Sequence, residues 1–197
     1  TYACAKASEL GATVIAMSDR NGYIVDEKGI DYKLLIKAKE NRQSIENYLK
    51  YSDTAKYYTN PSDVFKIKCD ICLPCATQNE INLDSAKALV ENGCLCVSEG
   101  ANMPTTLDAT VYLQEHDVLF GPAKAANAGG VGCSYFEMVQ NEEGTKWEFE
   151  KTDAKLKEMM VNIYHNVANT AKEYGAGGNL VVGANIFGFV TVINKMD

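Results

Sequence analysis

The sequence of 197 residues lacks a basic stripe and lacks any long, uninterrupted apolar run. It holds 19 Lys and Arg against 26 Asp and Glu, which gives a formal net charge of -7. An acidic surface repels phosphate backbones, so we expect no nucleic-acid partner. The longest apolar candidate, residues 180–193, is interrupted by glycine and asparagine and is shorter than the roughly 18 to 20 residues that span a bilayer. We therefore expect no membrane partner either.

The sequence also shows neither a secretory signal pattern nor a disulfide framework. It starts with Thr-Tyr-Ala-Cys-Ala-Lys, without a charged region followed by an apolar one. Its seven cysteines are odd in number and have no framework spacing. Free, buried thiols suit a reducing compartment, so a cytoplasmic protein is expected. The length is enough for one sizeable core, since domains usually have roughly 100 to 200 residues.

Short apolar runs alternate with helical patterns as far as residue 120. The runs, which are typical of buried parallel strands, are residues 13–18, 69–73, 95–98 and 118–120. The helical patterns between them are residues 31–40, 44–51, 83–91 and 106–115. This alternation predicts an α/β fold, a Rossmann-like dinucleotide-binding domain with a mostly parallel sheet.

Helical signals alone follow residue 120. Apolar residues at helical spacing from Leu156 to Tyr174 predict an amphipathic helix that ends at Gly175. Residues 180–193 are typical of a mostly buried last helix, although their β-branched content leaves a strand open. We divide the chain into an N-terminally incomplete dinucleotide-binding domain, residues 1–150, and C-terminal helices, residues 151–197.

The start of the sequence is the most informative feature. Residues 2–10 predict a helix, and a strand follows that ends at Ser18-Asp19. In a dinucleotide-binding βαβ unit, the acidic residue that bonds the adenosine ribose lies about 20 residues after the glycine-rich loop. Counting back from Asp19 passes the first residue, so we expect the first strand and its G-x-G-x-x-G loop to lie outside this sequence. Without that central strand the two halves of the sheet have no common neighbour, and the chain is not expected to be a complete folding unit.

The segment Asp19-Arg20-Asn21-Gly22 has two compatible interpretations. Asn-Gly is typical of a type I′ hairpin turn that leads into residues 23–25. Alternatively, Asp19 bonds the adenosine ribose, Arg20 lies beside a 2′-phosphate, and Ser18 adds a hydroxyl to that phosphate. An acidic residue favours NAD and an arginine favours NADP, so these residues leave the cofactor open and lean toward NADP.

Cys69, Cys72 and Cys75 form a C-x-x-C-x-x-C motif that is similar to three ligands of an iron–sulfur cluster, and the segment Cys94-Leu95-Cys96 could supply a fourth. However, residues three apart on a strand point to opposite faces. We therefore expect no metal, and an iron–sulfur protein remains the rival hypothesis.

Residues 121–134 form a glycine-rich segment, predicted as a bend before a helix that runs to about residue 140. It does not satisfy the nucleotide-triphosphate motif G-x-x-x-x-G-K-[ST]. Either it is a tight packing turn, or its small residues let a ligand approach, with Asn127 and Ser134 offering hydrogen bonds.

Four segments together resemble hexameric glutamate dehydrogenase, in particular its small-subunit, NADP-linked microbial type. They are Leu-Pro-Cys-Ala-Thr-Gln-Asn-Glu at 73–80, Glu-Gly-Ala-Asn-Met-Pro-Thr-Thr at 99–106, Lys-Ala-Ala-Asn-Ala-Gly-Gly-Val at 124–131 and Gly-Ala-Asn-Ile-Phe-Gly-Phe-Val at 183–190. The resemblance covers essentially the whole chain. Leucine, phenylalanine and valine dehydrogenases share the fold but lack the second segment in this form, so they are the alternative.

The resemblance implies roles for eight residues, and the local interpretation of the hairpin segment adds Arg20. The expected cofactor-binding residues are Ser18, Asp19, Arg20, Ala76, Thr77, Asn102 and Asn127. Val131 and Ser134 are expected to contact the amino-acid substrate, the serine hydroxyl meeting its side-chain carboxylate.

The resemblance also implies a reaction, the reversible NAD(P)-dependent oxidative deamination of L-glutamate to 2-oxoglutarate and ammonia. In the family, the lysine and the acid that act in this reaction belong to an N-terminal substrate domain, which no segment here matches. We thus expect no catalytic residue in this chain, an inactive isolated chain, C-terminal helices that pack back toward the substrate domain, and a homo-hexamer. A non-catalytic nucleotide-binding module is the alternative from another class of protein.

Overall fold

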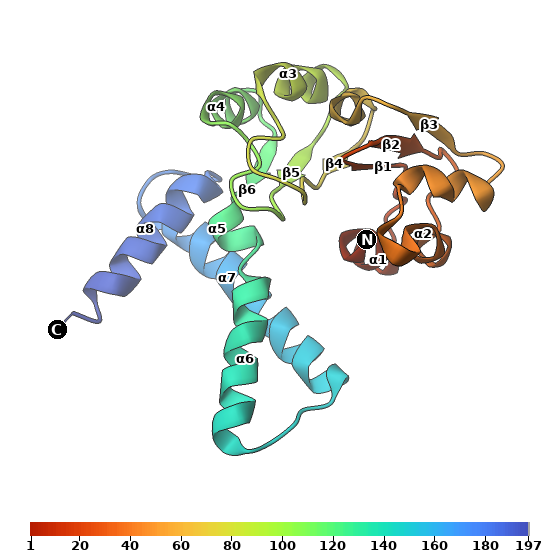
Figure 1. Cartoon of the computed structure of the whole chain (residues 1–197). Coiled ribbons are helices and arrows are strands. Elements are labelled where there is room, and N and C mark those ends of the chain that lie inside the picture. The colour runs from red at the N-terminus through yellow and green to blue at the C-terminus, as the bar shows by residue number, and fades with distance from the viewer. Residues whose placement is uncertain (197) are drawn as a thin grey trace.

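The computed structural model describes residues 1–196 and shows two small β-sheets, helices beside them, and a long helical arm (Figure 1). The strands are β1 (Ala16–Asp19), β2 (Gly22–Val25), β3 (Lys56–Tyr58), β4 (Ile71–Cys72), β5 (Cys96–Ser98) and β6 (Leu119–Gly121). The α-helices are α1 (Tyr2–Glu9), α2 (Tyr32–Lys39), α3 (Leu83–Glu91), α4 (Leu107–Glu115), α5 (Ala123–Ala126), α6 (Gly129–Glu143), α7 (Phe149–Glu173) and α8 (Leu180–Ile193). Three 3₁₀ segments are η1 (Glu40–Arg42), η2 (Ile45–Lys50) and η3 (Pro61–Lys66).

The first sheet has the order β1-β2-β3 and is antiparallel throughout, which corrects the expectation of a parallel, fully buried strand at 13–18. The strand β1 is half-buried along its length. The predicted hairpin is present, because Asp19 pairs with Gly22 across a two-residue turn.

The predicted turn type is wrong, since neither Arg20 nor Asn21 has the positive φ that a type I′ turn requires. The Asp19 carboxylate instead accepts a hydrogen bond from the Asn21 amide at 2.9 Å and so stabilises the turn itself. Gly22 is required for a different reason: a Cβ there would collide with the Tyr58 carbonyl oxygen and the Tyr57 ring.

The second sheet has the order β4-β5-β6 and is parallel, as expected for the α/β class. Helices α3 and α4 cover one of its faces (Figure 1). Their inner residues and the strands form one buried core, made of Phe65, Ile81, Ala86, Leu89, Cys94, Val97, Ala109, Leu113, Val118 and Phe120.

The two sheets share no strand among residues 1–196, in agreement with the expectation that the halves lack a common neighbour. The first sheet has its own core with α1, α2 and η2, made of Cys4, Ile24, Ile30, Leu35, Ala38, Ile45 and Tyr48. Between the two, η3 contacts β1 and β2 on one side and α3 on the other.

Helices α6, α7 and α8 form the arm that leaves the sheets (Figure 1). The predicted amphipathic helix is α7, and Gly175 after it has a φ of 71°, as a C-cap glycine does. Residues 180–193 are helical, as predicted, but they are not mostly buried, since Phe189 and Val192 are exposed while Gly183 faces α7. No helix of the described residues is both long enough and apolar enough to cross a bilayer.

The glycine-rich segment is helical rather than bent, because α6 already begins at Gly129. Glycine disfavours helix, but here small residues let α6 approach α7 closely. A Cβ on Gly132 would collide with the end of the Met159 side chain. Packing between helices therefore overrides the local preference.

Candidate functional site

A cleft of about 720 Å³ opens at the carboxyl ends of the parallel strands, where ligands bind in open α/β sheets. Its walls come from the loop after β4, the loop after β5 and the junction of α5 and α6. The lining residues are Ala76, Gln78, Gly100, Ala101, Asn102, Asn127, Gly130 and Val131.

Backbone hydrogen bonds fix the two strand-end loops against each other. The Pro74 carbonyl oxygen accepts hydrogen bonds from the amides of Gly100, at 2.9 Å, and Ala101, at 3.0 Å. A Cβ at position 100 would lie 2.6 Å from the Cys75 sulfur, so any larger residue there requires the Cys75 side chain to move. The cleft floor is thus backbone, which a flat ligand can approach closely.

Two asparagines meet at the wall of this cleft. The Nδ2 of Asn127 donates to the Ala101 carbonyl at 3.1 Å and to the Oδ1 of Asn102 at 2.7 Å. Because Asn102 Oδ1 is used in this way, the Asn102 amide group remains available as a donor, and the Asn127 Oδ1 remains available as an acceptor. One side of the cleft can therefore bind a ligand that carries both a donor and an acceptor.

Glu99 ties the end of β5 to two other segments. It is 5% exposed, and its carboxylate accepts hydrogen bonds from the amides of Thr105, at 3.2 Å, and Ala123, at 2.7 Å. Glu99 is the first residue of the Glu-Gly-Ala-Asn-Met-Pro-Thr-Thr segment, yet no role was predicted for it. An acidic residue directly after a buried strand was the signal that could have indicated one.

Glu80 supports the loop after β4 and was also missed. It accepts a hydrogen bond from the Ala76 amide at 3.0 Å and one from the Thr77 amide. Burial raises the pKa of the Glu80 carboxyl, although these two hydrogen bonds oppose the change. A carboxylate at this position holds the turn that presents Ala76 to the cleft.

The structure brings together four of the residues predicted as ligands: Ala76, Asn102, Asn127 and Val131 all line the cleft. Thr77 is exposed and follows Ala76 on the same loop. Ser134 is also exposed, and its hydroxyl lies 3.4 Å from the Gly130 carbonyl. Since Val131 and Ser134 are three residues apart on α6, they share one helix face.

The other three predicted residues, Ser18, Asp19 and Arg20, lie at the hairpin of the first sheet and are not among the residues that line the cleft. The Asp19 carboxylate accepts hydrogen bonds from Lys39 Nζ at 2.7 Å and from the Ile45 amide at 2.8 Å, besides that from Asn21. Its burial would raise the pKa, but these hydrogen bonds outweigh burial and hold the pKa of Asp19 below its ordinary value.

The family of glutamate/leucine/phenylalanine/valine dehydrogenases matches the sequence over residues 1–197. The chain belongs to this family. The α/β fold and the resemblance that the motifs indicated are thereby confirmed.

The relatives of this chain are glutamate dehydrogenases. The chain is 45% identical over 199 residues to the NADP-specific glutamate dehydrogenase of Escherichia coli and 42% identical over 202 residues to that of Helicobacter pylori, in each case over 99% of the chain. A crystal structure of Plasmodium falciparum glutamate dehydrogenase superimposes with a TM-score of 0.94 at 41% identity, over 99% of this chain and 43% of that one. The chain spans 44% and 45% of the length of the two bacterial enzymes, which is less than half.

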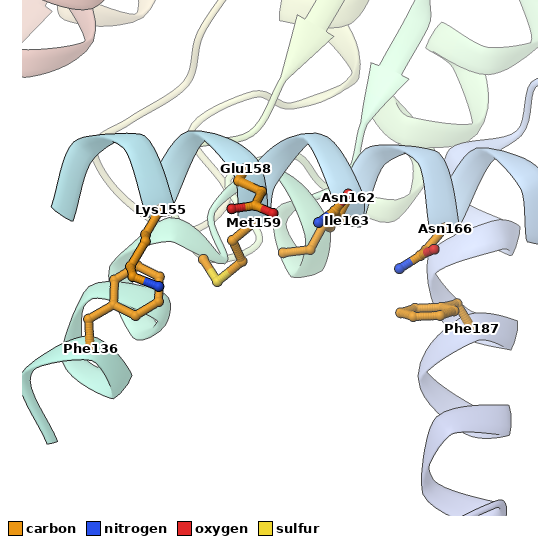
Figure 2. A pocket seen from close by; sticks show the side chains of 8 residues that line it. All are labelled: Phe136, Lys155, Glu158, Met159, Asn162, Ile163, Asn166 and Phe187. Atoms are coloured by element: carbon orange, nitrogen blue, oxygen red, sulfur yellow. The ribbon is translucent and has the colours of Figure 1, made fainter. Parts of the chain in front are cut away.

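A second hollow, of about 400 Å³, lies on the arm between α6, α7 and α8 (Figure 2). Figure 2 shows Phe136 of α6 beside Lys155 of α7, and Phe187 of α8 below Asn166. Met159, which packs against Gly132, lines the same hollow. None of the nine predicted residues lines it.

Proposed function

We propose that the chain is the cofactor-binding portion of an NADP-dependent glutamate dehydrogenase. The reaction is the reversible oxidative deamination of L-glutamate to 2-oxoglutarate and ammonia. The observation that carries the proposal is the cleft itself, which gathers Ala76, Asn102, Asn127 and Val131 from separate segments at the carboxyl ends of parallel strands. The printed names of the bacterial relatives support NADP as the cofactor and glutamate as the substrate.

The cleft fits the nicotinamide end of the cofactor. A nicotinamide carboxamide has one donor group and one acceptor, which match the available acceptor of Asn127 and donor of Asn102. The backbone floor at Gly100 lets a flat ring approach without a side chain between them. When bound, the cofactor supplies hydride transfer. These residues of the chain bind and orient it.

The hairpin of the first sheet fits the adenosine end. Arg20 is exposed at the turn, and a guanidinium can meet a 2′-phosphate with two parallel hydrogen bonds. Ser18 and Asp19 are the other residues that we assign to the ribose. Three of the roughly four lone-pair directions of the Asp19 carboxylate are already used, so it can accept one more hydrogen bond.

The exposed face of α6 fits the amino-acid substrate. Val131 is 72% exposed and offers an apolar surface one helical turn from the Ser134 hydroxyl, which can donate to a carboxylate. We assign no catalytic residue to this chain. The lysine and the acid that the chemistry needs are proposed to lie in the rest of the protein, with the C-terminal helices packed toward them. A homo-hexamer in the cytoplasm is the assembly and location implied by the resemblance.

The test is a steady-state assay of the full-length protein. We expect NADPH oxidation that depends on both 2-oxoglutarate and ammonium, with a higher kcat/KM than for NADH. The 2-oxo acids of leucine, phenylalanine and valine are the controls, and equal or better kcat/KM with one of them would assign the chain to that dehydrogenase instead. NADPH binding without turnover on any of these substrates would point to a non-catalytic module.

A further inference from the structure

Four free cysteines lie on or just before β4 and β5, and two of them, Cys69 and Cys94, precede these strands at the ends that lie away from the cleft. Cys69 and Cys72 belong to the β4 segment, and Cys94 and Cys96 to the β5 segment. Ile71 is aligned with Cys96 in the parallel register, so the positions two residues earlier, Cys69 and Cys94, are also aligned. Adjacent strands lie about 4.8 Å apart, and disulfides need Cα atoms roughly 4.4 to 6.8 Å apart.

The contacts around these two residues bring their side chains together. The Asp70 carbonyl oxygen accepts hydrogen bonds from the amides of Leu95, at 2.9 Å, and Cys96, at 3.2 Å. The sulfur of Cys94 lies 3.7 Å from the same oxygen. The Cys94 thiol also donates to the Cys96 carbonyl oxygen at 3.3 Å, and Cys69, the residue before Asp70, packs against the buried core to which Cys94 belongs. Two thiols from segments 25 positions apart are therefore direct neighbours.

We propose that Cys69 and Cys94 form a reversible disulfide when the protein meets a hydroperoxide. The Cys94 thiolate attacks one oxygen of the peroxide, the O–O bond breaks, and water or an alcohol leaves after taking up a proton. The sulfur of Cys69 then attacks the resulting sulfenic acid, its S–H proton leaves with the hydroxyl as water, and the S–S bond forms. The formal oxidation state of each sulfur rises by one, and the peroxide is reduced by two electrons.

Cys94 is the better nucleophile of the cluster. The hydrogen bond from the Cys69 thiol lowers the pKa of Cys94, whereas burial raises the pKa of Cys72. Cys94 is 5% exposed, so small oxidants reach it more easily than large ones, and Cys69 beside it is only partly buried. Cys75 does not compete, because it lies in the loop at the cleft, against Gly100.

The test is peroxide treatment of the full-length protein, followed by a peptide map and reduction with dithiothreitol. We expect a cross-linked peptide that joins Cys69 to Cys94, lost on reduction, and a thermal midpoint several degrees higher in the oxidised protein, because the disulfide closes a loop in the unfolded chain. Cys69→Ser and Cys94→Ser should each lose both effects. Cys133→Ser, which removes an exposed thiol on α6, is the matched control and should keep them.

The peptide map of the peroxide-treated wild-type protein shows which cysteines are joined, even where a variant fails to fold. A disulfide that joins Cys94 to Cys72 or to Cys96, or oxidation of Cys94 to a sulfinic acid without any cross-link, would overturn the proposal.

Discussion

Asp19 and Arg20 are neighbours in the hairpin turn, but their side chains have opposite surroundings. Lys39 of α2 and the first amide of η2 hold the Asp19 carboxylate, which is 17% exposed, so this residue joins the hairpin to the helices behind it. Arg20 is exposed, and no described residue forms an ion pair with it. Asp19 therefore stabilises the fold and is also a candidate cofactor-binding residue, whereas the Arg20 side chain is available for binding the cofactor.

The Arg20→Ala change in the full-length protein should weaken the binding of NADPH far more than the binding of NADH. Only NADPH carries the 2′-phosphate, and a hydrogen bond to a charged group contributes about 1.5 to 3 kcal/mol. Comparing KM for the two cofactors measures the difference. Lys87→Ala, which removes an exposed positive charge from α3, is the control and should leave both constants unchanged. An equal loss for the two cofactors would show that Arg20 does not meet the phosphate.

The Asp19→Asn change should lower the free energy of unfolding by about 1 to 3 kcal/mol at neutral pH, because it removes the ion pair with Lys39 and weakens the hydrogen bonds to the carboxylate. Since the pKa of Asp19 is lower in the folded protein, its contribution is present above the ordinary carboxyl pKa and is lost as the pH falls through the lowered value.

Urea unfolding at neutral pH and at about pH 3 measures this dependence. The free energies of unfolding of the wild type and of the Asp19→Asn variant should become similar at the acid end. The exposed Asp53, changed to asparagine, is the control and should show no such pH-dependent difference. A gap between wild type and Asp19→Asn that stays constant with pH would contradict the assignment.

At the scale of elements, α8 is held to the rest of the chain at three places. The Gln114 side chain of α4 donates to Asn179, the N-cap residue of α8, at 3.0 Å. Lys124 of α5 donates to Asn185 of α8. Gly183 lies directly against α7, where the Val167 carbonyl and Ala171 leave no room for a Cβ. The position of α8 therefore depends in part on close backbone approach to α7.

Gly183→Ala should destabilise the protein by about 1 to 3 kcal/mol, because overpacking against backbone cannot be relieved by a rotamer change. Gly188, on the same helix, has no atom within 4 Å of a Cβ built there. Gly188→Ala should thus stabilise the helix by up to about 1 kcal/mol. Chemical unfolding of both variants measures the contrast, and a similar effect of the two changes would show that α8 does not pack through Gly183.

Most helices could be predicted from the sequence, because apolar spacing alone defines them, as from Leu156 to Tyr174 in α7. The helical glycine segment could not, since the residue that packs on it, Met159 of α7, is far along the chain. The cleft residues Asn102 and Asn127 follow from strand ends and motifs. The position of Glu99 directly after a strand could have indicated a role, but its partner could not be predicted, because Ala123 is 24 positions away and no local pattern reports that hydrogen bond.

Residues 1–196 form two cores rather than one, and we expect this to determine how this part of the protein opens. Ile24 is fully buried among α2 and η2, and Leu113 is fully buried among α3 and the parallel strands. No strand of residues 1–196 joins the two sheets, and η3 is the element that contacts both sides. Cooperative units in proteins follow contiguous packing, so we expect the two cores of this chain to open independently.

Hydrogen exchange on the full-length protein tests that expectation with one variant in each core. Ile24→Ala and Leu113→Ala each remove a side chain with no exposed surface, which costs about 2 to 5 kcal/mol. Ile24→Ala should speed exchange in β2 and α2 and leave the amides of α3 and α4 as protected as before, while Leu113→Ala should do the reverse. If either variant speeds exchange in both cores, then η3 couples them into a single cooperative unit, and the junction at Phe65 becomes the place where that coupling is transmitted.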